Sequence, residues 1–153
     1  MSATADGLPH VDEHSAVIEA GADAAWDALL RVAEGTVSAG AAPHLARALG
    51  CADVAAAGPR PLAEGSVVPG FHVAEADAPR ELALVGSHRF SNYALLFHLD
   101  DLGSGRTRVR AETRAEFPGF KGSAYRAMVI GTRMHVLVTR RMLGGVKRLA
   151  ERA

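Results

Sequence analysis

Residues 120–152 read FKGSAYRAMVIGTRMHVLVTRRMLGGVKRLAER, the longest segment of the chain with a helical hydrophobic period. At 100° per residue its basic side chains gather on one side, which we expect to face water. The opposite side carries mainly apolar and small residues: Met128, Gly131, Thr132, His135, Val138, Thr139, Met142, Gly145, Val146 and Leu149. The spacing predicts one helix that runs the length of the domain along a sheet.

The inward side of this predicted helix is unusual because it holds a histidine, two threonines and two glycines. A glycine in a helix costs about 1 kcal/mol relative to alanine, so either close packing or a bound molecule should compensate. Two interpretations of His135 stay open. It is a hydrogen-bonded core residue beside threonines that bond back to their own helix, or it is a polar contact in a cavity for a mostly apolar ligand.

Composition indicates one domain with an incompletely filled interior. The chain has 153 residues, of which 48% are hydrophobic and only 5% aromatic. Alanine supplies much of the non-aromatic hydrophobic content. A sheet lined with alanine can enclose volume, because small side chains fill space poorly. We expect residues 1–9 to be a flexible tail and 10–153 to be a single domain.

The charge is balanced overall but divided along the chain. The formal net charge is zero, which argues against a nucleic-acid binder, yet residues 121–153 hold 8 basic and 1 acidic side chains, leaving 9 basic and 16 acidic in residues 1–120. The simpler interpretation is that opposite charges dock the helix on the body. The alternative is a basic ridge for anionic lipid or a ligand phosphate.

Several classes of site and location are not indicated. The single cysteine, Cys51, cannot form an intrachain disulfide and fits a reducing cytoplasm. The first residues do not resemble a signal peptide, and no apolar stretch is long enough to cross a bilayer. His10 and His14 have a metal-binding spacing only on a helix; on the expected strand they lie about 13 Å apart, too far for one tetrahedral ion. We expect neither a metal nor a cofactor.

The remaining elements follow in order. Alternation over 10–20 predicts a strand, an apolar stripe over 22–33 predicts a helix, and Pro43 begins a short helix over 43–49. Strands are expected near 71–75 and over 81–90, with an irregular region at 34–65. The clearest hairpin pairs 93–99 with 107–117 around a glycine-rich turn. If paired residue numbers sum to 208, one face carries the pairs Leu99–Val109, Phe97–Ala111 and Leu95–Thr113, while the alternate residues 108–116 point to water.

This order resembles the START-related helix-grip (SRPBCC) superfamily, which includes pollen-allergen-like proteins, lipid-transfer domains and polyketide cyclases. The likeness is carried by residues 17–20 leading into 25–29, by 69–71, and by 125–149, and it spans nearly the whole chain. It implies an α+β fold in which a curved antiparallel sheet wraps around a long C-terminal helix, with two short helices after the first strand. It also implies a cavity between sheet and helix, with walls formed by Tyr93, Leu95, Phe97, Val109, Ala111, Thr113, Met128, Thr132, His135, Thr139 and Met142.

Three functions remain open at this point. The first is a non-catalytic binding or carrier protein for a hydrophobic small molecule such as a lipid, polyketide or isoprenoid. The second is a cyclase, aromatase or dehydratase that uses His135 as general acid or base with a hydroxyl such as that of Tyr93 or Thr113. The third is a homodimer formed through Ile130 and Leu137, which the helical period places among the charged side chains.

Overall fold

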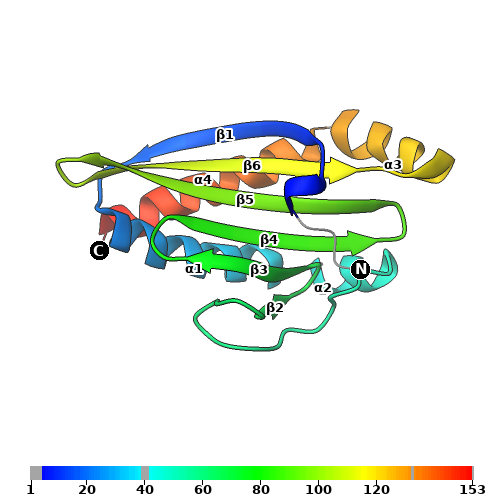
Figure 1. Cartoon of the computed structure of the whole chain (residues 1–153), viewed down its shortest axis with the longest axis horizontal. Coiled ribbons are helices and arrows are strands. Elements are labelled where there is room, and N and C mark those ends of the chain that lie inside the picture. The colour runs from blue at the N-terminus through cyan, green and yellow to red at the C-terminus, as the bar shows by residue number, and fades with distance from the viewer. Residues whose placement is uncertain (1–4, 39–41, 132, 153) are drawn as a thin grey trace.

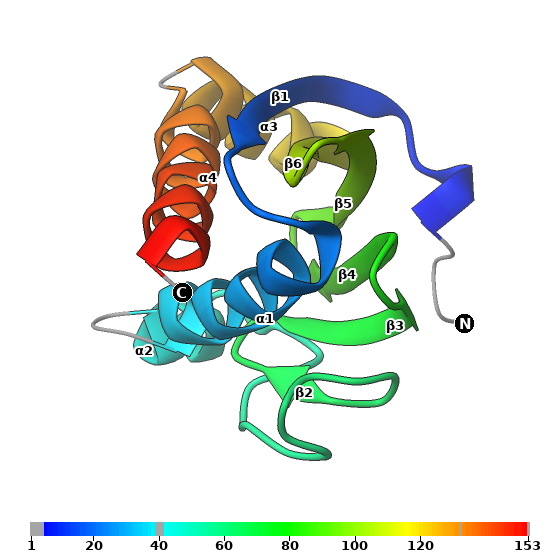
Figure 2. The ribbon, with the colours of Figure 1, turned by 90° about the vertical axis from the view of Figure 1, so that its left-hand side faces the viewer.

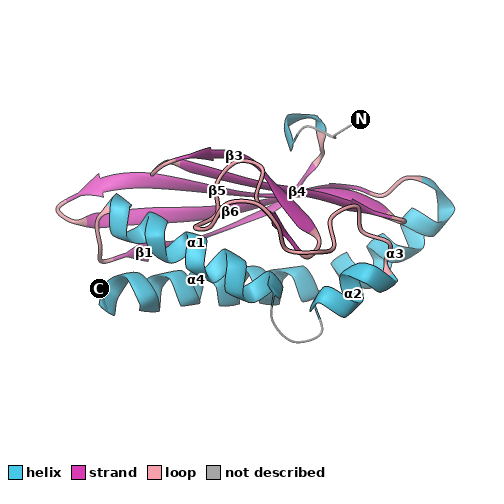
Figure 3. Ribbon diagram, turned by 90° about the horizontal axis from the view of Figure 1, so that it is seen from below, coloured by secondary structure: helices cyan, strands magenta, loops and turns pink. Residues whose placement is uncertain are grey.

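The computed structural model describes residues 5–38, 42–131 and 133–152, and it has the predicted α+β architecture (Figure 1). Its elements are η1 (Ala5–Gly7), β1 (His10–Ile18), α1 (Ala22–Ser38), α2 (Ala42–Ala48), β2 (Val67–Val68), β3 (Phe71–Asp77), β4 (Glu81–His88), β5 (Ser91–Gly103), β6 (Arg106–Glu116), α3 (Gly119–Gly131) and α4 (Met134–Arg152). The six strands form one antiparallel sheet in the order β1-β6-β5-β4-β3-β2. The sheet curves; α1, α2 and α4 lie on its concave side, and α3 lies at one end of the sheet (Figures 2 and 3).

The predicted hairpin register is confirmed. β5 and β6 pair Leu99 with Val109, Phe97 with Ala111 and Leu95 with Thr113. The first two pairs lie in the core under α1 and α4, where Phe97, Val109 and Ala111 are fully buried. The shared face is therefore the concave one, as the alternation of apolar residues requires.

The C-terminal segment is two helices rather than the single helix predicted. α3 ends at Gly131 and α4 begins at Met134, with Arg133 between them in the left-handed region at φ 58°. The Arg133 N–H donates to Ile130 O at 3.2 Å, and Arg133 O accepts from Val136 N–H at 3.1 Å. These bonds close one helix and open the next, and the low helix propensity of Gly131 favours a break here. Thr132 lies outside the described residues.

The outer face of the sheet is not wholly wet. Leu8 is only 6% exposed and packs with Ala83, Val85, Ala94 and Leu96 on the convex side. Glu112, expected in water, is 8% exposed. The described part of the segment before β1, residues 5–8 of the expected flexible tail, packs against the sheet through Ala5 and Leu8. Apolar residues at even positions of β5, overlooked in the alternation, explain why it packs there.

The first helix is longer than predicted, and the irregular region after it is organised around an arginine. α1 ends at Ser38 rather than near residue 33. Arg60 donates to the backbone carbonyls of Ala57, Pro59 and Val67 and to the carboxylate of Glu34. One side chain thus holds the chain between α2 and β2 in place, although few of its residues belong to a regular element.

Candidate functional site

A cavity of about 570 Å³ lies between the concave face of the sheet and the four helices, with α1 contributing only Thr36. Its walls come from segments far apart in the chain: Thr36, Leu45, Ala46, Leu49, Cys51, Pro69, Gly70, Phe71, His88, Ser91, Tyr93, Ala94, Leu95, Thr113, Ala115, Phe117, Tyr125, Val129, Ile130, His135, Val138, Thr139 and Arg141. Most of these side chains are apolar. The volume falls within the range of small-molecule sites, which is about 300–1,000 Å³.

Five of the predicted wall residues do line this cavity: Tyr93, Leu95, Thr113, His135 and Thr139. Four others, Phe97, Val109, Ala111 and Met142, are buried in the core beyond its end. Met128 is 59% exposed on α3 and does not line the cavity. Five predicted wall residues therefore lie outside this cavity: Phe97, Val109, Ala111, Met142 and Met128. The sheet and α4 pack directly on each other over part of their length, and the helix break turns α3 away from the direction that we extrapolated.

Ile130 also departs from expectation. The unbroken helical period placed it on the charged face as a dimer contact, but it lines the cavity. Leu137 is exposed, as predicted. The two residues therefore do not share one outward surface.

Sequence reasoning missed an aromatic cluster at one end of the cavity. The His88 ring meets the Tyr125 ring edge to face at 4.7 Å between centroids, Tyr125 stacks on Phe90 at 5.5 Å, and Phe71 meets Tyr93 at 5.1 Å. Phe117 lies 6.2 Å from Tyr125. The chain has only eight Phe, Trp and Tyr residues, and the Phe and Tyr side chains named here come from separate segments. Their low number and wide spacing in the sequence gave no indication that they meet.

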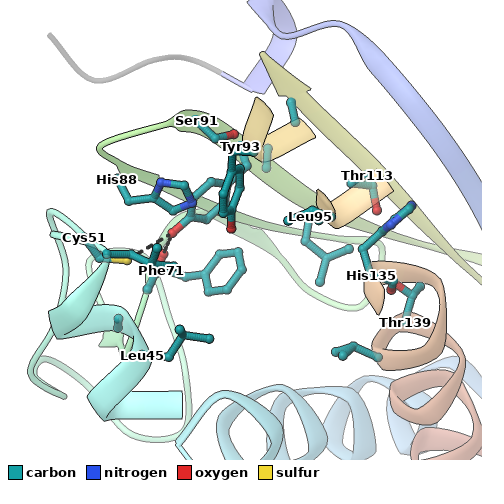
Figure 4. A pocket seen from close by; sticks show the side chains of 18 of the residues that line it. Leu45, Cys51, Phe71, His88, Ser91, Tyr93, Leu95, Thr113, His135 and Thr139 are labelled. Atoms are coloured by element: carbon teal, nitrogen blue, oxygen red, sulfur yellow. Dashed lines mark hydrogen bonds between the residues drawn. The ribbon is translucent and has the colours of Figure 1, made fainter. Parts of the chain in front are cut away.

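Tyr93 anchors the aromatic end. Its hydroxyl donates to Gly70 O at 2.6 Å and lies 3.7 Å from Cys51 Sγ (Figure 4). Burial raises the pKa of Tyr93 far above its ordinary value, and the neighbouring Cys51 adds to the shift. Burial likewise raises the pKa of Tyr125. Both phenols therefore stay protonated and neutral across the physiological range.

His88 is a neutral partner within this cluster. Burial lowers the pKa of its imidazole, and its Nδ1 accepts from the Phe90 N–H at 3.1 Å. Accepting at Nδ1 places the proton of the neutral ring on Nε2. The aromatic end thus presents no charge to the cavity.

The opposite side is more polar. In Figure 4, Thr113, His135 and Thr139 lie together across from His88 and Tyr93, with Leu95 between the two groups. His135 Nε2 is 2.7 Å from Asp12 Oδ2 on β1, and Thr139 Oγ1 donates to His135 O at 2.7 Å. Among the described residues, His135 Nδ1 and Asp12 Oδ1 are buried without a hydrogen-bond partner. Buried polar atoms without a hydrogen-bond partner are expected where a ligand or water completes a site.

The described part of the chain contains no group of three His, Cys, Asp or Glu residues arranged to hold a metal ion. Nor does any of its helices combine the length and apolar character needed to cross a membrane.

Comparison with known proteins establishes the fold. No protein-family model and no curated protein matches the sequence. Among solved structures, the Zhui aromatase/cyclase from Streptomyces sp. R1128 matches with a TM-score of 0.60 at 17% identity, covering 95% of this chain and 94% of that one. Norcoclaurine synthase from Thalictrum flavum matches with a TM-score of 0.57 at 12% identity, covering 93% and 95%. Ara h 8.0201 matches with a TM-score of 0.54 at 7% identity, covering 96% and 100%. The chain therefore has the helix-grip fold that its sequence resembles.

Proposed function

We propose that this protein binds a hydrophobic small molecule, such as a lipid, polyketide or isoprenoid, and carries it in the cavity between the sheet and the C-terminal helices. The observation that carries the proposal is the apolar cavity of about 570 Å³. An apolar interior normally packs to near-crystalline density, so a void of this size loses contacts that a ligand would restore.

The distribution of polar groups favours a ligand with an apolar body and one polar end. At the aromatic end the Tyr93 hydroxyl is already bonded to Gly70, so it is not free to donate elsewhere. At the other end His135 keeps one unused nitrogen beside Thr113 and Thr139. The apolar body should therefore lie against the aromatic cluster, with the polar group toward His135.

A cavity-filling variant tests binding directly. Leu95 projects into the middle of the cavity (Figure 4), so Leu95→Trp should fill it. Delipidated protein should bind fluorescent fatty acids or aromatic polyketides saturably, and Leu95→Trp should weaken this binding at least about tenfold. Leu102→Trp, in the exposed β5–β6 hairpin, is the matched control. The proposal fails if no hydrophobic probe saturates the wild type, or if both variants bind equally well.

A second candidate is an enzyme of the cyclase, aromatase or dehydratase kind. The observation that favours it is the 2.7 Å contact of His135 with Asp12, because a carboxylate that orients an imidazole is a common arrangement for a general acid or base. The fold is also shared with an aromatase/cyclase and a synthase. His135→Gln should then abolish turnover while ligand binding persists. Unchanged turnover in that variant would leave only the binding function.

A further inference from the structure

The large exposed hydrophobic side chains of the described residues are concentrated on three of the helices. The described residues include six such side chains, and five lie on α2, α3 and α4, each of which contributes residues to the cavity wall. We call these five the helix-side patch: Leu45 on α2, Phe120 and Met128 on α3, and Leu137 and Val138 on α4. The sixth, Leu102, lies in the distant β5–β6 hairpin (Figure 1). Scattered exposed hydrophobics need no explanation, but this concentration does.

The most exposed side chain of the helix-side patch lies on α3. Phe120, in the first turn of α3, is 90% exposed. Together with Phe90, Lys121, Ala124, Tyr125 and Met128 it lines a shallow depression on the outside of α3. Tyr125 belongs to both the depression and the cavity wall, so the two hollows adjoin the same residue of α3.

The same helices carry positive charge that is not balanced locally. Between Phe117 and Ala150 the chain has seven basic residues and no acidic one, and 35–52 likewise lacks acidic residues. Six of the seven are exposed: Lys121, Arg126, Arg133, Arg140, Arg141 and Arg148. No ion pair within the described residues involves these six. The acidic excess lies in residues 1–120, largely in the strands and their connections.

From this combination we infer that the helix-side patch docks on an anionic lipid surface. Exposed aromatic and aliphatic side chains interleaved with lysine and arginine suit the boundary between acyl chains and negatively charged headgroups. The same surface would repel the acidic remainder of the molecule. This repulsion would orient the protein with α2, α3 and α4 toward the bilayer.

The charge also argues against the other simple occupant of this patch, a second copy of the chain. A two-fold interface would set the basic helices against their own symmetry mates, and like charges at an interface are unfavourable. A phosphate-bearing polymer would contact the arginines but would offer no apolar surface to the exposed Phe120 side chain.

Docking in this orientation would bring the cavity to the membrane. Leu45 and Val138 are both exposed and both line the cavity, so they lie at its rim within the patch. A hydrophobic molecule could then pass between bilayer and cavity with little exposure to water. This inference goes beyond the proposed function, since docking itself requires no bound ligand.

Vesicle co-sedimentation of the ligand-free full chain tests the inference. The wild type should bind vesicles that contain phosphatidylglycerol, bind pure phosphatidylcholine vesicles far less, and lose binding as salt rises. Removing one basic residue near an anionic surface weakens binding about fivefold, so Lys121→Glu/Arg126→Glu should weaken it at least about 25-fold. Phe120→Ser should weaken it about tenfold or more. Arg108→Glu and Leu102→Ser, at exposed sites outside the three helices, should bind like the wild type.

Three results would overturn the inference. One is that the wild type fails to bind anionic vesicles. Another is that the helix and control variants bind alike. The third is that sedimentation velocity shows a dimer that Phe120→Ser dissociates, which would assign the patch to a second copy. The cavity-filling Leu95→Trp variant should still dock, so a failure of ligand binding and a failure of docking are separate results.

Discussion

His135 Nε2 lies 2.7 Å from Asp12 Oδ2 and thereby joins α4 to β1 at the polar side of the cavity. The same carboxylate oxygen is 3.4 Å from His14 Nε2. Together with the bond that Lys147 Nζ donates to Val17 O at 2.9 Å, this contact holds α4 against β1, the edge strand of the sheet. It therefore influences both stability and the shape of the cavity.

Replacing Asp12 should expose the cost of that contact. Asp12→Ala leaves His135 Nε2 without its partner in a partly buried site, and an unsatisfied polar group costs about 1–3 kcal/mol. We expect the free energy of unfolding, measured by urea denaturation, to fall by that amount. Glu13 is the exposed neighbouring residue, and its Oε2 lies 3.8 Å from Arg110 Nη1. Glu13→Ala should change the free energy of unfolding by about 0.5 kcal/mol or less. Equal effects in the two variants would contradict a special role for the Asp12–His135 contact.

Alkaline pH should destabilise the protein through its two tyrosines. Burial raises the pKa values of Tyr93 and Tyr125 in the folded state, whereas an unfolded tyrosine ionises near about 10. The unfolded chain therefore releases protons first. The stability contribution is complete below about pH 10 and declines as pH rises above that value toward the folded pKa values.

Ultraviolet titration of tyrosinate absorbance can follow the ionisation of the two tyrosines as the pH rises. The native protein should show little tyrosinate near pH 10, and the signal should appear together with unfolding. Tyr93→Phe should flatten the alkaline decline in stability and also lose about 1 kcal/mol at neutral pH, because the Gly70 carbonyl loses its donor. A native protein that titrates like free tyrosine would contradict this account.

At acid pH the opposite sign applies to Glu112. Burial alone would raise its pKa, but hydrogen bonds from His10 and Arg114 outweigh burial and lower it. The unfolded carboxyl then binds protons more readily, so the stabilisation is complete above the unfolded pKa of about 4.3 and is lost as pH falls through the folded pKa. Glu112→Gln should lower stability at neutral pH by about 1–3 kcal/mol and flatten the acid limb of the pH–stability curve. Glu75→Gln, at an exposed position of β3, is the control and should leave that limb unchanged.

The sheet was largely predictable from the sequence. Side chains of a strand alternate with a period of two residues, so the sequence pattern directly indicates which residues share a face. The turn at Gly103–Gly105 and the alternation on each side were enough to pair Leu95 with Thr113. The order of elements followed from helical and strand periods separated by Gly and Pro. These signals are local, so they do not depend on how the layers pack.

The boundary between cavity and core was not predictable in this way. Tyr93, Leu95 and Phe97 share one face of β5, yet the first two line the cavity and the third is buried in the core. The same division separates His135 from Met142 along α4. Periodicity says which side chains point inward, but whether another layer reaches them depends on where α1 and α4 lie. The break before α4 and the meeting of Phe71, His88 and Tyr125 are likewise consequences of tertiary structure.

Gly86 is the position where the aromatic end of the cavity should be most sensitive to a single methyl group. It lies in β4 directly opposite Tyr93 of β5. A Cβ built there would overlap the carbonyl oxygen of Gly70 and would lie 2.6 Å from Tyr93 Cε2. Both neighbours are held by the bond from the Tyr93 hydroxyl to Gly70 O, so neither can move without disturbing the other.

Gly86→Ala should therefore act on the site as well as on stability. Overpacking of this kind costs about 1–3 kcal/mol, and any shift of the Tyr93 ring changes the cavity wall. We expect a lower free energy of unfolding and weaker binding of a hydrophobic probe. Gly21→Ala is the matched control, because a Cβ at Gly21 meets nothing within 4 Å; it should leave probe binding unchanged. Wild-type affinity in Gly86→Ala would mean that the ligand does not contact the Tyr93 end of the cavity.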